Sequence, residues 1–311
     1  MDRRDSQCPY VAGNTIKLYL KIKGEELATD AEVIRLFEPF TLSSAMVVRI
    51  ACSSLAREGD MVLKLFDRQF ATQLQEDEKL RPWTSDIERG YHQFVLDGGA
   101  SDFITELKNN GEIAHQGETW NTCQDEDYLH DHLSDLYETE AQIYDALRDL
   151  QGHDVPQPVP CVKMPGFSLT DPKPVSELIG VSGILLQYID GFPLTDISHY
   201  TQREQWQSIC EEAIQILHRI GDRGVLNEDV QTRSFIVQKD KACSEKGYKV
   251  FMIDFALCNF RKDYADDNNW SESKAIQDEE GAIGLIMQDR LEGGFVYSRS
   301  NRYKKPAHYY E

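Results

Sequence analysis

The stretches NEDVQTRS at residues 227–234 and FMIDFA at residues 251–256 are the most informative part of this chain. In each stretch an aspartate, Asp229 or Asp254, follows a short apolar run that is typical of a strand. Ser234 stands five positions after the first aspartate and opens another apolar run. One strand-end carboxylate can accept the proton of an attacking hydroxyl, while the other holds magnesium on phosphates. The spacing therefore predicts a paired-carboxylate site suited to phosphoryl transfer.

Length and composition are those of an ordinary globular protein. The chain has 311 residues, of which 41% are hydrophobic and 10% aromatic, so one large domain or two lobes can bury a core. No apolar run reaches the ~18–20 residues of a membrane span, and the N-terminus has no apolar region typical of a signal peptide. The seven cysteines form no CxxC pair and no zinc-type cluster with histidine. We therefore expect reduced thiols in a cytoplasmic or nuclear protein without a membrane partner.

The charge balance is strongly acidic. A formal net charge of −20 argues against nucleic acid as an obligate partner, because phosphate backbones attract basic surfaces. The acid is concentrated over residues 109–147, which contain ten Asp and Glu residues and no Lys or Arg. This segment is either a solvated helix face or a docking surface for a basic partner.

The order of predicted elements indicates an α+β fold with two lobes. We expect an N-terminal extension over residues 1–30, an N-lobe over 31–190 with a small antiparallel sheet and a helix, and a mainly helical, compact C-lobe over 191–311. A helical insertion is expected at about residues 68–130, and a hinge follows the strand-like run GILLQYI. The clearest elements are strands at 33–40, 45–52, 60–67 and 183–189, and helices at 131–150, 202–222 and 279–291.

These segments carry a resemblance to a known family. Lys64 in VLKLF, Asp229 in NEDVQTRS and Asp254 in DFA follow one another in the order of the protein-kinase-like superfamily. The chain is most similar to the fungal kinase-like proteins, and its compact C-lobe is similar to those of aminoglycoside and choline phosphotransferases. The resemblance covers roughly residues 33–295 and implies a two-lobed kinase-like fold that binds ATP and Mg²⁺.

For the N-lobe, the resemblance implies a set of nucleotide contacts. Lys64 would contact the α- and β-phosphates, although a strand lysine that only extends its amine to solvent is the alternative. Glu140 would hold this lysine, with Glu138 as the second choice. The glycine-rich loop is replaced by residues 39–44, so Ser43 and Ser44 would contact phosphate. The hinge residues expected to receive the adenine are Leu186, Gln187, Tyr188 and Ile189.

For the C-lobe, the resemblance implies catalytic roles and includes departures. Asp229 matches the catalytic-loop aspartate, a general base, and Asp254 matches the magnesium aspartate, although Ala256 replaces the family's glycine. Ser234 stands where the family has asparagine, the second magnesium ligand. Asn227 and Glu228 replace His-Arg, which implies weaker packing around the base and activity independent of activation-loop phosphorylation.

Two functions therefore remain open from the sequence. The first is an ATP- and magnesium-dependent phosphotransferase that acts on an unidentified hydroxyl, either of a small molecule or of a protein. The second is a pseudokinase that serves as a nucleotide-binding or protein-interaction module without turnover. Ser234, Asn227 and the missing glycines favour the second function, while the two retained aspartates favour the first.

Overall fold

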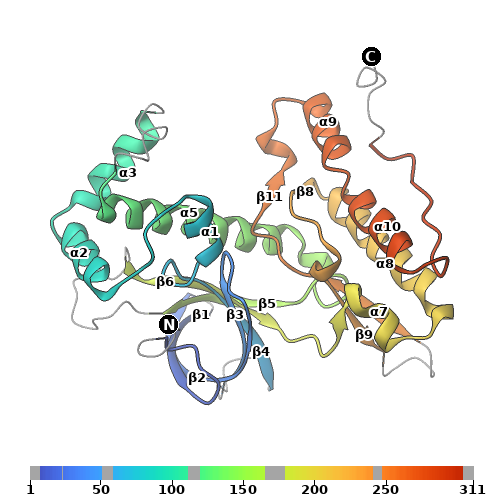
Figure 1. Cartoon of the computed structure of the whole chain (residues 1–311), viewed down its shortest axis with the longest axis horizontal. Coiled ribbons are helices and arrows are strands. Elements are labelled where there is room, and N and C mark those ends of the chain that lie inside the picture. The colour runs from blue at the N-terminus through green and yellow to red at the C-terminus, as the bar shows by residue number, and fades with distance from the viewer. Residues whose placement is uncertain are drawn as a thin grey trace. The chain divides into compact units, whose positions relative to one another are not determined.

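The structure, a computed structural model, describes residues 8–22, 24–50, 59–110, 120–164, 179–240 and 247–303. It divides into two compact units, which we call the sheet unit (Met1–Glu138 and Pro158–Tyr188) and the helical unit (Thr139–Gln157 and Ile189–Glu311). The N-terminal part is rich in strands and the C-terminal part in helices (Figure 1). The expected α+β class is therefore confirmed.

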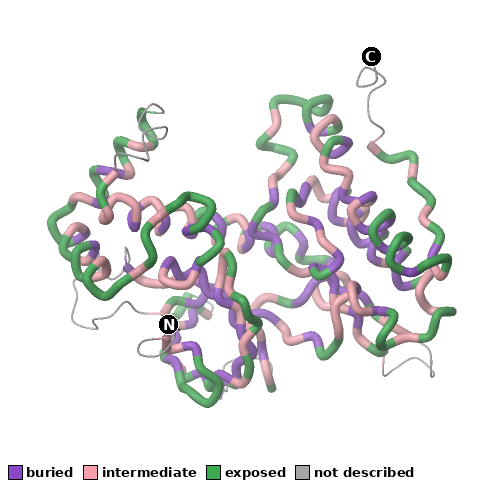
Figure 2. Tube along the Cα trace, in the orientation of Figure 1, coloured by how far each residue is buried: buried purple, intermediate pink, exposed green. Residues whose placement is uncertain are grey.

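A closed barrel forms the core of the sheet unit. Its hydrogen-bonded order is β1-β2-β3-β4-β6-β5, and β1 closes the ring by pairing antiparallel with both β2 and β5. Apolar residues at alternate positions form the buried core of the barrel, as period-two strands with one buried face require. Figure 2 shows buried residues recurring along the strands. The strands are β1 (Thr15–Ile22), β2 (Glu25–Phe37), β3 (Ser44–Ile50), β4 (Asp60–Phe66), β5 (Pro158–Met164) and β6 (Val181–Gln187).

This barrel corrects the expected small open sheet. Residues 15–30, for which we expected an N-terminal extension, supply β1 and the start of β2. Leu18 and Leu20 are fully buried in the barrel, whereas Lys17 and Lys21 on either side of this pair are exposed and Tyr19 between them is half-buried. That alternation is the signal of a half-buried strand, and it is present in the sequence. One overlooked strand therefore accounts for the difference between an open sheet and a closed barrel.

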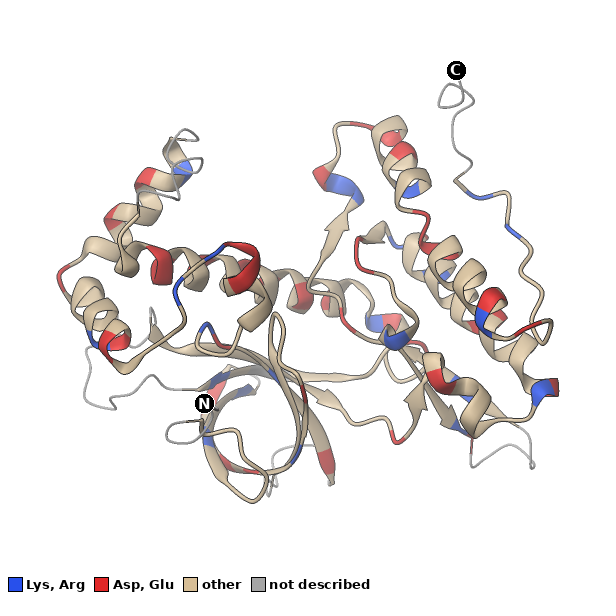
Figure 3. Ribbon diagram, in the orientation of Figure 1, with Lys and Arg blue, Asp and Glu red and all other residues tan. Residues whose placement is uncertain are grey.

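Helices complete the sheet unit. Some acidic residues of segment 109–147 make buried contacts within this unit. Acidic side chains recur along α5 (Figure 3). However, Glu126 is buried against Arg68, which also pairs with Glu88 at 2.5 Å, and the Tyr91 hydroxyl donates to Asp127 at 3.0 Å. The segment is therefore only partly a solvated face. The helices are α1 (Thr72–Asp77), α2 (Ser85–Leu96), α3 (Gly99–Asn109) and α5 (Thr122–Ala146), the last of which crosses into the helical unit.

Asp127 provides a pH-dependent prediction. Burial raises its pKa to about 6, and its Oδ2 has no hydrogen-bond partner among the described residues. A carboxyl whose folded pKa exceeds its unfolded value of about 3.9 makes the fold less stable as pH rises between the two values. Asp127→Asn keeps an acceptor for Tyr91 and removes the charge, so we expect the free energy of unfolding at pH 7.5 to rise by about 1 kcal/mol, allowing for screening.

Urea unfolding at pH 5 and pH 7.5 measures this effect. The wild-type protein should lose stability between these pH values and the variant should lose less, while the exposed Asp102→Asn serves as the matched control. A variant less stable than wild type at pH 7.5 would show that the fold needs the ionised carboxylate.

The helical unit is built around two packed helices and two small sheets. Helix α8 buries the stripe Ile209, Ala213, Ile216 and Ile220 that its spacing predicts, and it packs on α10. Gly224 ends the turn after α8 with φ of +70°, a conformation that favours glycine. The elements are α7 (Ile197–Tyr200), α8 (Arg203–Gly221), α9 (Asp267–Gln277), α10 (Glu279–Arg290), β7 (Phe192–Pro193), β8 (Val225–Asn227), β9 (Phe235–Lys239), β10 (Tyr248–Met252) and β11 (Cys258–Phe260).

The sheets have the orders β10-β9-β7 and β11-β8, and both place the predicted aspartates at strand ends. Short 3₁₀ turns connect several elements: η2 (Arg148–Leu150), η3 (Leu194–Asp196), η4 (Thr232–Ser234) and η5 (Arg261–Asp263). Within the described parts of the chain, no helix combines the length and the apolar character that a bilayer crossing requires.

Candidate functional site

The two aspartate segments lie side by side in the helical unit. β8 ends at Asn227, which pairs with Cys258 of β11 in an antiparallel ladder. One step further on, the Glu228 N–H donates to the Leu257 carbonyl at 2.9 Å. Asp229 therefore directly follows the paired part of its segment. Asp254 lies in the connection between β10 and β11, three residues before Leu257.

Asn227 joins the two segments through its side chain. It is 1% exposed, and its Oδ1 accepts the Asp229 backbone N–H at 2.8 Å while its Nδ2 donates to the Asp254 carbonyl at 3.0 Å. A buried amide with both ends satisfied is both stable and specific in geometry. The asparagine itself therefore connects the two loops, while the weaker packing expected where histidine is replaced stays a prediction.

Asp254 has an unusual backbone conformation. Its φ of +73° lies in the left-handed region, which costs a non-glycine residue roughly 1–3 kcal/mol. The flanking hydrogen bonds hold it there: Asn227 donates to its carbonyl, and the preceding Ile253 N–H donates to the Ser234 carbonyl at 2.8 Å. The Asp254 side chain is exposed. The surrounding contacts thus maintain a strained backbone that presents a carboxylate to solvent.

Ser234 lies close to Asp254 in the fold, just before β9. It ends the turn η4, and its neighbour Phe235 pairs with Met252 at the start of the β9–β10 ladder. Ser234 and Asp254 therefore stand at one end of this ladder as two oxygen donors. Among the described residues no group of three or more His, Cys, Asp or Glu could hold a metal by itself. Magnesium often binds through one or two protein oxygens with phosphate and water as the other ligands, so this donor set fits it.

Asp229 is half-buried and partly oriented by a neighbour. The Gln231 Nε2 donates to its Oδ1 at 2.6 Å. The Asp229 N–H donates to the Asn227 side chain, and this bond together with the bond from Gln231 restrains Asp229 in its loop. A restrained carboxylate on a loop between two short strands is a suitable general base.

Glu279 and Lys274 bind the backbone of β8, the strand that leads into the Asp229 loop. The sequence analysis did not identify either residue. Glu279 is 5% exposed; its Oε1 accepts the Asn227 backbone N–H at 2.9 Å and its Oε2 pairs with Lys274. The Lys274 ammonium also donates to the Val225 carbonyl at 3.2 Å. Burial raises the pKa of Glu279, although Lys274 opposes this shift. The only signal in the sequence was an acid in the first turn of a helix, which normally indicates a surface residue that complements the helix dipole.

Glu140 lies in the helical unit with the Asp254 segment. It is fully buried on α5, one turn before Tyr144. Burial raises the pKa of Tyr144 well above its usual value, and the negative charges of Glu140 and Asp254 add to this rise. The Tyr144 ring packs edge-on against Phe255, with 5.2 Å between centroids. The structure therefore groups Glu140 with Asp254, whereas its predicted contact with Lys64 stays a prediction.

The remaining predicted residues belong mainly to the barrel. Lys64 is in β4, with its Nζ 5.5 Å from the centroid of the Phe66 ring. Ser44 is fully buried on the face of β3 that carries Met46, and its predicted phosphate contact stays a prediction. Ser43 is half-buried and stays a candidate. The hinge candidates lie at the end of β6 and just after it: Leu186, Gln187, Tyr188 and Ile189, the last of which begins the helical unit's second segment.

Comparison with known proteins gives fold-level likenesses only. No protein-family model and no curated protein matches the chain. Among solved structures, the chain is similar to the BubR1 kinase domain at 10% sequence identity and a TM-score of 0.43, covering 85% of this chain and 55% of that one. It is also similar to WaaP in complex with acyl carrier protein, at 10% identity and a TM-score of 0.38, covering 84% of this chain and 88% of that one. The chain thus spans little more than half the length of the BubR1 chain.

Proposed function

We propose that the chain is a kinase-like phosphotransferase that uses ATP and Mg²⁺ to phosphorylate a hydroxyl acceptor. The observation that supports this most is the Asn227 side chain, which connects the backbones of Asp229 and Asp254 across 25 positions of sequence. Phosphoryl transfer requires little covalent chemistry from the protein and depends on carboxylates held in fixed positions. A buried amide that fixes two acidic segments meets this requirement.

Asp229 is the proposed general base. Its carboxylate is restrained by the Gln231 amide and by the backbone bond to Asn227, so it can orient an acceptor hydroxyl. As the γ-phosphoryl group moves to the hydroxyl oxygen, the hydroxyl proton moves to the Asp229 carboxylate. The exposed neighbour Glu228 offers no cationic group to a phosphorylated loop, in keeping with activity that does not depend on such phosphorylation.

Asp254 and Ser234 are the proposed magnesium ligands. When bound, magnesium neutralises the negative charge that develops on the phosphates. The exposed Asp254 carboxylate contributes negative charge, and the bond from Asn227 to its carbonyl holds its left-handed backbone. Ser234 contributes a neutral oxygen at the same end of the ladder.

The other nucleotide contacts are assigned by the resemblance to kinase-like proteins. Lys64 binds the α- and β-phosphates, and Glu140 holds Lys64. Ser43 approaches phosphate where the family has a glycine-rich loop. The adenine lies against the backbone of residues 186–189.

A nucleotide-binding or protein-interaction module without turnover is the second candidate. One observation favours it: Ser234 is 4% exposed, and its side chain is shorter than that of asparagine. In either case we place the protein in the cytoplasm or nucleus. We also retain residues 109–147 as a docking region for a basic partner, reduced by the acids that Arg68 and Tyr91 use internally.

Isothermal calorimetry tests the proposal. We expect ATP to bind about tenfold or more tightly with Mg²⁺ than with EDTA, because phosphate charges are then compensated. Asp254→Asn should lower the affinity in magnesium to the value measured in EDTA. Asp240→Asn, another residue of the helical unit that follows a strand end, is the matched control and should bind as wild type. Absence of nucleotide binding in the wild-type protein would eliminate both the phosphotransferase and the nucleotide-binding module, and would leave only the protein-interaction module.

A further inference from the structure

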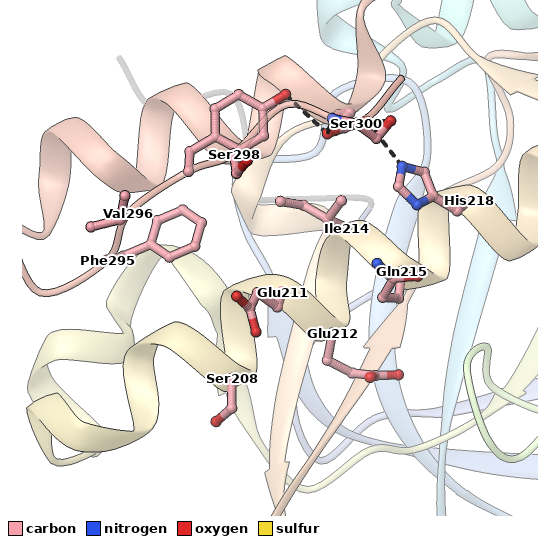
Figure 4. A pocket seen from close by; sticks show the side chains of 12 residues that line it. Ser208, Glu211, Glu212, Ile214, Gln215, His218, Phe295, Val296, Ser298 and Ser300 are labelled. Carbon is pink, nitrogen blue, oxygen red and sulfur yellow. Dashed lines mark hydrogen bonds and ion pairs between the residues drawn. The ribbon is translucent and has the colours of Figure 1, made fainter. Parts of the chain in front are cut away.

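Residues 294–302 form a strap that runs along α8 and α10 and is held by specific contacts. The Gln207 side chain both accepts from the Val296 N–H at 2.9 Å and donates to the Val296 carbonyl at 3.1 Å. The Tyr297 ring lies on Gly284 of α10, where a Cβ would come within 2.2 Å of the ring. The strap and α8 together line a pocket of about 360 Å³ (Figure 4). The strap is therefore a structured element of the helical unit.

The strap holds the first turn of α10 at two adjacent points. Arg299 forms a two-pronged ion pair with Asp278, the residue whose carboxylate caps α10 at the Gly281 N–H. Glu280 accepts the Ser300 N–H at 2.8 Å and the Ser300 hydroxyl at 2.6 Å.

Two further groups converge on Glu280. Its Oε1 accepts the Tyr297 hydroxyl at 3.2 Å, and its Oε2 lies 3.0 Å from His218 Nε2 (Figure 4). Burial alone would raise the pKa of Glu280, yet the donors from Ser300 and His218 bring it below its usual value. Glu280 is therefore held as a carboxylate that fixes the strap to α10.

Glu279 stands between Asp278 and Glu280 in the sequence. It holds the Asn227 backbone N–H, and Asn227 in turn holds Asp229 and Asp254. From this we infer that the strap is a positioning element for the candidate catalytic loop, acting through Asp278 and Glu280 on the placement of Glu279. This inference deepens the proposed function and rests on it only for its catalytic consequence.

The expected consequence is a local coupling. When the strap is released, the first turn of α10 loses the contacts to its cap and to Glu280, so the bond from Glu279 to the Asn227 N–H opens more often. The Asn227 and Asp229 amides report this directly, because each donates to one bond of the path. Coupling between such sites typically amounts to about 5-fold or more.

Amide hydrogen exchange on the full chain tests the inference, with Arg299→Gln and Gly284→Ala as two independent ways to release the strap. The first removes the ion pair to Asp278, and the second displaces the Tyr297 ring by a methyl group. Arg302→Gln is the matched control, because Arg302 pairs with Asp222 after α8 and not with α10. We expect exchange at Asn227 and Asp229 to rise about 5-fold or more in both release variants, with less than 2-fold change in the control.

Hydrogen exchange at the Ile216 and Val296 amides separates the inference from its alternatives. Ile216 reports on the stability of α8, and Val296 reports on release of the strap. A rise of equal size at Ile216, in the centre of α8, would show general destabilisation and overturn the inference. So would release at Val296 without a change at Asn227, or no release at Val296 in either variant. Where the protein turns over, the release variants should lower kcat more than they raise KM for ATP. Exchange coupling without any turnover in the wild type would instead count against the proposed function alone.

Discussion

Asp229→Asn is expected to lower turnover by about 10²–10⁴-fold while leaving ATP affinity nearly unchanged. Asparagine keeps an oxygen that can accept the Gln231 amide, and the backbone bond to Asn227 does not involve the side chain that is changed. The loop should therefore keep its shape and lose only the ability to take the acceptor proton. Single-turnover kinetics with Mg²⁺ and ATP, with calorimetry of ATP binding on the same samples, measures the two quantities separately.

The matched control is Glu228→Gln, the exposed neighbouring acid, which should retain wild-type turnover within about 2-fold. Equal rates for wild type and Asp229→Asn would remove Asp229 from the chemistry, even with magnesium-dependent ATP binding intact. Binding without turnover in the wild type would favour the pseudokinase function.

Much of the helical unit could be predicted from the sequence. Helix α8 and the strands around Asp229 and Asp254 have strong apolar periodicity, and short apolar runs that end in polar residues mark strand ends reliably. The barrel was harder, because in β1 the two lysines Lys17 and Lys21 flank Leu18 and Leu20 and lower the overall hydropathy of the segment.

The hydrogen bonds and the ion pair that hold the candidate site in place could not be predicted from residue types alone. Asn227 looks like a loss when compared with histidine, because sequence shows which group is missing and not which bonds the new group makes. Glu279 and Lys274 become informative only when tertiary packing brings the start of α10 under β8. Ser44 is a further case: its hydroxyl is of the right type for a phosphate contact, but residue type alone does not show that it is fully buried.

Lys274→Met is expected to lower the free energy of unfolding by about 3–5 kcal/mol, the usual cost of removing one partner of a buried ion pair. Methionine fills a similar volume, so the loss should come from Glu279, whose carboxylate would remain buried without its cation. Burial already raises the pKa of Glu279, and losing Lys274 raises it further. A carboxyl with a raised folded pKa destabilises the fold progressively as pH rises, so the deficit should be larger at pH 8 than at pH 5.

Urea unfolding of wild type and variant at these two pH values measures both the loss and its pH dependence. Lys249→Met is the control. The Lys249 side chain is exposed and its Nζ lies 3.8 Å from Asp240 Oδ2, so this pair should contribute less than about 1 kcal/mol to the free energy of unfolding. In the double variant Lys274→Met/Glu279→Gln, the neutral amide oxygen can still accept the Asn227 N–H, so part of the stability should return. A loss that is the same at both pH values, or a double variant no more stable than Lys274→Met, would show that packing around Lys274 and not its charge supports the candidate catalytic loop.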